Sequence, residues 1–123
     1  MNEAADAWSR TGSVRLRRVA WPHEADIRLY WTDQLPPTNP GVTMLYRNRA
    51  GRLIRAHVFI RAMPAPWNNG TPDRVLYGTI AHELGHALGL GHDASPGALM
   101  HPAPLATSIT PADAGKLAHL RKR

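Results

Sequence analysis

The segment Ala81–Asp93, AHELGHALGLGHD, constrains the fold of this chain more than any other stretch. His82 and His86 are four residues apart, so an α-helix would place both imidazoles on one face, one turn apart. Gly89 follows three residues after His86, where glycine can end a helix in the left-handed conformation. The chain can then turn back and bring His92 toward the same point. The segment therefore predicts a helix that ends in a sharp turn, with three histidines converging.

Converging imidazoles are typical ligands of zinc, and a catalytic zinc site keeps three protein ligands and one open position. Glu83 lies one residue beyond His82, about 100° around the helix. Its carboxylate can therefore reach a water molecule at the open position more easily than the ion. We predict that His82, His86 and His92 bind one catalytic Zn²⁺ ion and that Glu83 is the general base. Glycine inside a helix costs about 1 kcal/mol relative to alanine, so Gly85 indicates a close-packed neighbour.

Length and composition exclude several other classes of protein. The 123 residues suffice for one small domain with a single core. The absence of cysteine excludes disulfides, thiolate metal sites and cysteine nucleophiles. No apolar stretch approaches the roughly 18 residues of a transmembrane helix, so we expect no membrane span. The net charge of +6 permits loose contact with anionic surfaces, but no nucleic-acid-binding motif accompanies it, so we do not expect nucleic acid as a partner.

Strand and turn signals fill the first half of the chain. Residues 3–10 are expected to be helical, with Gly12 as the stop. Gly51 lies in the stretch NRAG and can adopt a positive φ, so the β-forming runs on either side of it predict a β-hairpin. Alternation of apolar and polar residues, or a high content of β-forming residues, predicts strands over four stretches: 13–21, 26–31, 41–47 and 52–61.

Two helices are predicted in the second half of the chain. The first runs from about residue 72 or 73 to Leu88, with Thr71 or Asp73 as the cap. The second covers residues 110–123, with Thr110 as the N-cap and Asp113 at the third position. The order of strands, hairpin, helix, irregular segment and helix indicates helices packed on a mixed sheet.

The longer pattern HExxHxxGxxH narrows this interpretation. His82, Glu83, His86, Gly89 and His92 match every fixed position, and Met100 follows in GALMHP. In these residues the sequence resembles the metzincin zinc metalloproteases, and most closely their matrixin branch, peptidase M10. The resemblance implies an α+β fold with a twisted mixed β-sheet, an antiparallel edge strand, an active-site helix and a C-terminal helix. It also implies that Met100 is the Met-turn residue, which packs beneath the zinc ligands without binding the ion.

The resemblance carries further expectations about organisation and activity. Residues 1–123 would form one catalytic domain, with a sheet-rich part over 1–71 and the active-site helix, Met-turn and last helix over 72–123. The protein would be a zinc-dependent endopeptidase, monomeric, acting on protein or peptide substrates that lie along the edge strand 41–47. Residues 97–104 would form the wall of the pocket for the side chain after the cleaved bond. The family favours a secreted location, although the first residues lack a secretory signal and a leader or N-terminal segment is expected to be missing unless the protein is cytoplasmic.

Two residues depart from the matrixin pattern. Asp93 replaces the usual serine and is more similar to the adamalysin branch, and His101 stands where matrixins have tyrosine. The shape of the specificity pocket is therefore left open. Two alternatives to an enzyme are a catalytically silent zinc-binding module and a basic interaction module. The intact Glu83 favours an enzyme, because a structural site would be closed by a fourth protein ligand.

Overall fold

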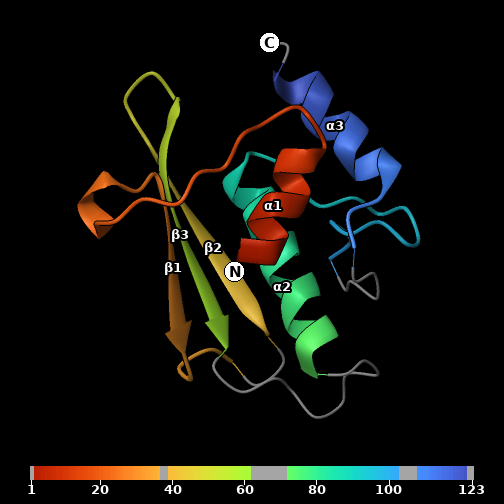
Figure 1. Ribbon diagram of the computed structural model, residues 1–123, viewed down its shortest axis with the longest axis horizontal. Helices are drawn as coiled ribbons and strands as arrows, with labels where there is room; N and C mark the ends of the chain where they lie inside the picture. The colour runs from red at the N-terminus through yellow and green to blue at the C-terminus, as the bar shows by residue number, and fades with distance from the viewer. Residues whose placement is uncertain (1, 37–38, 62–71, 103–107, 122–123) are drawn as a thin grey trace.

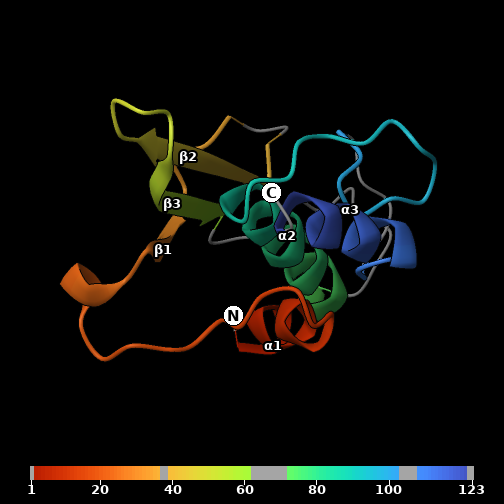
Figure 2. The same cartoon turned by 90° about the horizontal axis from the view of Figure 1, so that it is seen from above.

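The structure, a computed structural model, describes residues 2–36, 39–61, 72–102 and 108–121. Its elements in chain order are α1 (Asn2–Arg10), the short 3-10 helix η1 (Pro22–Glu24), β1 (Ile27–Thr32), β2 (Gly41–Arg47), β3 (Leu53–Arg61), α2 (Pro72–Ala87) and α3 (Pro111–Arg121). The three α-helices lie on one side of the sheet (Figures 1 and 2), and α2 contacts β2, β3 and α1. The predicted α+β architecture is confirmed.

The sheet is mixed, as expected. The strand order is β1-β3-β2, with β1 parallel to β3 and β2 antiparallel to it, so β2 is an antiparallel edge strand. Val58 at the centre of β3 pairs with Leu29 of β1 and with Thr43 of β2. Because side chains of directly paired residues point to the same face, Thr43 shares the face of Val58, which is fully buried in the core.

The hairpin between β2 and β3 confirms the prediction made from its turn. Gly51 has a φ of 80°, which glycine adopts without steric cost. The side chain of Asn48 accepts hydrogen bonds from the backbone N–H groups of Ala50 and Arg52, each at 3.0 Å. The local sequence therefore closes the turn by itself and aligns the two strands.

The strand predicted over residues 13–21 is wrong. Residues 14–19 form no regular element, and β1 begins only at Ile27. Val14 and Leu16 nevertheless pack against the core, and the backbone N–H of Leu16 donates to Ser9 Oγ at 2.9 Å. The alternation of apolar residues therefore indicates only that one side of this segment is buried. A strand also requires a neighbouring strand with which it can form hydrogen bonds.

The core lies between the sheet and α2 and continues to α1 and α3. The indole of Trp8 is fully buried, and its Nε1–H donates to the carbonyl of Ala81 at 2.9 Å, which fixes α1 against α2. The largest fully buried apolar side chains come from these layers and from the segment between α2 and α3: Trp8, Val58, Ile60, Ile80, Leu84, Leu99, Met100 and Leu117. In the part of the chain that the structure describes, no helix is both long and apolar enough to span a bilayer.

Candidate metal centre and active site

The end of α2 has the geometry that its glycine predicts. Gly89 has a φ of 106°, and its N–H donates to the carbonyl of His86 at 2.9 Å. The N–H of Leu90 donates to the carbonyl of Gly85 at 3.0 Å, which completes a Schellman motif. Helix α2 therefore ends at Ala87, one residue after His86, and the chain reverses toward the histidine face.

This turn brings three histidines together. One ring nitrogen from each of His82, His86 and His92 lies within 4.8 Å of the other two. His82 Nδ1 lies 2.6 Å from the carbonyl oxygen of Leu99, and His86 Nδ1 lies 2.8 Å from that of Leu90. A carbonyl only accepts hydrogen bonds, so each Nδ1 carries the proton and donates, which leaves Nε2 free as an acceptor or ligand. His82 is buried, His86 is half-buried and His92 is exposed, so the cluster opens toward solvent on the His92 side.

The surroundings of His82 and His92 favour their neutral form. Burial lowers the pKa of His82, and the neighbouring His86 lowers it further, while the hydrogen bond to the Leu99 carbonyl opposes the shift. The pKa of His92 is also lowered, by desolvation first and then by the proximity of His86 and His82, with a smaller contribution from His101. Metal ligation requires neutral imidazole, so the lowered pKa values of His82 and His92 favour the form that binds an ion.

Glu83 is buried beside this cluster and is held by the edge strand. The hydroxyl of Thr43 on β2 lies 2.7 Å from Glu83 Oε1 and 3.0 Å from the Glu83 carbonyl oxygen. Burial raises the pKa of Glu83, while the Thr43 hydrogen bond and the nearby His86 and His92 oppose the shift. At Gly41 the backbone of β2 comes so close that a Cβ there would lie 2.9 Å from Glu83 Cγ. The carboxylate is thus enclosed between α2 and β2 and interacts electrostatically with the histidines.

Met100 lies beneath the helix that carries the histidines. Its side chain is 2% exposed, and a Cβ added to Gly85 would lie 2.5 Å from its sulfur. Gly85 is therefore required for close packing, as predicted from its unfavourable position inside a helix. The backbone N–H of Asp93 donates to the Met100 carbonyl at 2.9 Å, which ties the residue after His92 to this turn.

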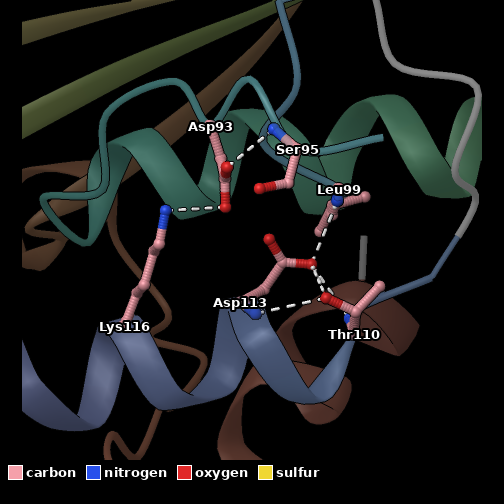
Figure 3. A network of polar contacts seen from close by, with 6 residues as sticks. All are labelled: Asp93, Ser95, Leu99, Thr110, Asp113 and Lys116. Atoms are coloured by element: carbon pink, nitrogen blue, oxygen red, sulfur yellow. Dashed lines mark hydrogen bonds and ion pairs between the residues drawn. The ribbon is translucent and has the colours of Figure 1, made fainter. Parts of the chain in front are cut away.

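The buried carboxylate of Asp113 connects α3 to the Met100 turn (Figure 3). Asp113 Oδ2 accepts hydrogen bonds from the N–H of Leu99 at 3.0 Å, from the N–H of Thr110 at 2.9 Å and from the Thr110 hydroxyl at 2.6 Å. The N–H of Asp113 lies 3.2 Å from Thr110 Oγ1, so the predicted cap is confirmed. Since Leu99 also holds His82 through its carbonyl, the cap of α3 supports a histidine of the cluster through one intervening residue.

A second contact joins the turn after His92 to α3. Asp93 Oδ2 lies 2.6 Å from Lys116 Nζ, and Asp93 Oδ1 accepts a hydrogen bond from the Ser95 N–H at 2.9 Å (Figure 3). These hydrogen bonds, first that to Lys116, lower the pKa of Asp93 to about 2. The carboxylate therefore stays ionised near neutral pH and fixes the loop that presents His92.

The three histidines, Glu83 and Met100 were predicted from the sequence as site residues, and the structure places them close together. Sequence reasoning missed the contact of Thr43 with Glu83 and that of Lys116 with Asp93, for which the sequence carries no local signal. Asp113 was recognised as a cap but not as an anchor for Leu99. Thr71, and residues 103 and 104 of the expected pocket wall, lie outside the described residues.

The donor set fits a zinc ion. Three imidazoles converge, and at least two of them are oriented by backbone carbonyls in the way that metal-binding histidines are. Within the described ranges this is the one group of three such side chains with the spacing of metal ligands. A mixed sheet covered on one face by helices, with two histidines on a helix and the third after a glycine turn, defines a metzincin-type domain.

Comparisons with known proteins agree with this class. The matrixin model of peptidase M10 matches residues 1–114. Human (Homo sapiens) matrix metalloproteinase-20 is 53% identical over 104 residues, which cover 80% of this chain and 21% of that protein. Human neutrophil collagenase is 30% identical over 107 residues, which cover 83% of this chain and 22% of that protein. Human matrilysin is 28% identical over 109 residues, which cover 83% of this chain and 40% of that protein.

The chain belongs to the matrixin family of zinc metalloproteases. Asp93 is therefore a departure within the matrixin branch. The chain spans only about a fifth to two fifths of the length of these curated relatives.

Proposed function

We propose that this chain is a zinc-dependent endopeptidase in which His82, His86 and His92 hold one ion and Glu83 acts as the general base. The observation that carries the proposal is the convergence of the three imidazoles beside a buried carboxylate. When bound at such a site, zinc lowers the pKa of a coordinated water and polarises the carbonyl of the scissile bond.

Glu83 supplies the proton transfers in this proposal. Its carboxylate accepts the proton of the attacking water and returns it to the leaving amine. Burial raises the pKa of Glu83, which brings it closer to the value that suits a group alternating between base and acid near neutral pH. A hydroxyl has one proton to donate and two lone pairs, so Thr43 can remain hydrogen-bonded to Glu83 in both of its protonation states.

The edge strand β2 is the candidate guide for the substrate. Its position at the edge leaves backbone groups available for an extended peptide to pair with, as in β-augmentation. Met44, Leu45 and Tyr46 on this strand are exposed, at 48%, 38% and 38% of their surface. We place the scissile bond near the end of β2 that contacts Glu83, and residues 97–102 near the pocket for the following side chain.

A digestion of a peptide library with and without chelator tests this function. We expect cleavage that chelator abolishes and zinc restores, and a zinc content near one per chain that His86→Ala loses. Glu83→Gln should retain zinc and lose cleavage. Wild-type cleavage rates for Glu83→Gln would contradict the assigned role of the carboxylate.

The same experiment separates the enzyme from the alternatives. Zinc binding without cleavage of any peptide would identify a silent zinc-binding module. Salt-dependent binding of nucleic acid by the metal-free protein would favour a basic interaction module instead. We expect a monomer, which light scattering of the purified chain can check.

A further inference from the structure

We propose that Thr43 is a positioning residue that holds the Glu83 carboxylate in its working orientation. The proposal rests on the proposed function, since it presumes that Glu83 moves the proton. Thr43 lies on β2, 40 residues before Glu83 in sequence, and its hydroxyl lies 2.7 Å from Glu83 Oε1.

The direction of the Thr43 side chain supports this assignment. Thr43 pairs with Val58 across the sheet and therefore points to the buried face covered by α2. Its hydroxyl faces the helix, while the backbone of β2 stays at the edge of the sheet. A substitution of this side chain can therefore change Glu83 without removing the groups along which a peptide would pair.

The contact restricts Glu83 on more than one side. Thr43 Oγ1 also lies 3.0 Å from the carbonyl oxygen of Glu83, so its one proton can be donated either to the side chain or to the backbone of the same residue. Next to it, Gly41 leaves just enough room for Glu83 Cγ, since a Cβ there would lie 2.9 Å away. Oε1 of the carboxylate is thus held by β2, and in this proposal Oε2 is the oxygen that accepts the proton of the attacking water.

This orientation matters because a long side chain that is free to rotate rarely adopts the reactive geometry. Displacements of about 1 Å at a reacting group can cost up to about a hundredfold in rate. A hydrogen bond to a buried carboxylate oxygen selects one rotamer from the several that glutamate can adopt. The expected effect of losing it lies in the chemical step and not in substrate binding.

The kinetic test compares hydroxyl-free and hydroxyl-bearing variants of the full chain loaded with zinc. Thr43→Val keeps the β-branched shape and should lower kcat about tenfold, with KM within about twofold of wild type. Thr43→Ser should restore kcat to within about threefold of the wild-type value. Thr43→Ala is a second hydroxyl-free variant in case valine prevents folding. Thr79→Val is the matched control, because Thr79 lies on α2 with its methyl group facing Gly41, and it should leave kcat unchanged.

A second readout follows the carboxylate itself without any turnover. The chain contains three glutamates, Glu3, Glu24 and Glu83, so ¹³C labelling of glutamate carboxyl groups gives three resonances. The resonance that disappears in Glu83→Gln is that of Glu83. At a fixed pH in the metal-free protein it should move in Thr43→Val and return toward its position in Thr43→Ser, while Thr79→Val leaves it in place.

The outcomes distinguish this proposal from the function on which it rests. Full activity of Glu83→Gln would show that the proposed function is wrong, whatever Thr43 does. An inactive Glu83→Gln with an unchanged kcat and an unmoved Glu83 resonance in Thr43→Val would overturn the positioning role alone. A loss of kcat that is equally large for Thr79→Val would also overturn it, because the effect would then be one of packing between α2 and β2.

Discussion

Replacing Asp113 by alanine should destabilise the protein by about 1.5–5 kcal/mol, because one carboxylate oxygen accepts hydrogen bonds from three donors. The buried N–H of Leu99 would lose its acceptor, at a cost of about 1–3 kcal/mol. Loss of the hydrogen bonds with Thr110 at the start of α3 adds about 0.5–2 kcal/mol. The sum is a large part of the roughly 5–15 kcal/mol that stabilise a typical domain.

Urea unfolding of the metal-free protein, followed by circular dichroism, measures this change without a contribution from metal binding. Asp6→Ala is the control, because Asp6 is exposed on α1 and its loss should change the free energy of unfolding by less than about 0.5 kcal/mol. Asp113→Asn keeps a carbonyl oxygen that can accept hydrogen bonds, so its free energy of unfolding should fall less than that of Asp113→Ala. Equal midpoints for Asp113→Ala and Asp6→Ala would refute the reasoning.

The same variant should also weaken zinc binding. Leu99 receives the hydrogen bond of Asp113 at its N–H and holds His82 through its carbonyl at 2.6 Å. Residues that orient metal-binding histidines typically affect metal affinity by about 10- to 100-fold. Because Asp113 acts through Leu99, we expect Asp113→Ala to weaken zinc affinity by about tenfold, the lower end of this range. Competition with a zinc-binding dye measures the affinity. An unchanged affinity would show that the Leu99 turn holds its position without α3.

Three further predictions concern the turn at Gly89, the stability at low pH and the effect of zinc on stability. Gly89→Ala should cost about 1–2 kcal/mol in urea unfolding, because its φ of 106° is strained for alanine. The pKa of Asp93 falls from 3.8 to about 2 on folding, so its stabilisation is present above pH 3.8 and is lost as the pH falls toward 2. Lys116→Met should reduce that acid-induced loss of stability, as measured by urea unfolding at several pH values. The same loss of stability between about pH 4 and pH 2 in both proteins would contradict the role of Lys116 in lowering the pKa of Asp93. Zinc at about 100 times its Kd should add about 2.7 kcal/mol to the stability of the wild type and nothing in His86→Ala, as followed by thermal unfolding.

Short sequence patterns predicted those structural elements whose hydrogen bonds join residues close together in the sequence. The hairpin follows from Gly51 and Asn48, and the end of α2 follows from Gly89, because the hydrogen bonds involved join residues within five positions. The histidine cluster was predictable for the same reason, since a helix and a glycine turn suffice to bring its members together.

Long-range contacts explain what the sequence did not reveal. The hydrogen bond between Thr43 and Glu83 joins residues 40 positions apart, and the ion pair between Asp93 and Lys116 joins residues 23 apart. Such pairs depend on how the sheet and helices pack, and neither periodicity nor composition specifies them. The incorrect prediction of a strand over residues 13–21 has the same cause. The sequence pattern showed which side of the segment is buried, but not whether another strand lies beside it.

All three histidines lie within residues 82–92, and the carbonyls that orient two of them belong to Leu90 and Leu99 rather than to the sheet. The sheet therefore contributes none of the predicted ligands, and among the described residues it reaches Glu83 through Thr43 and Gly41. Mutations at the exposed positions of β2 can then accumulate without loss of metal affinity. Selection can then alter the exposed face of the edge strand while leaving the histidine cluster intact, so the two parts of the domain can change independently.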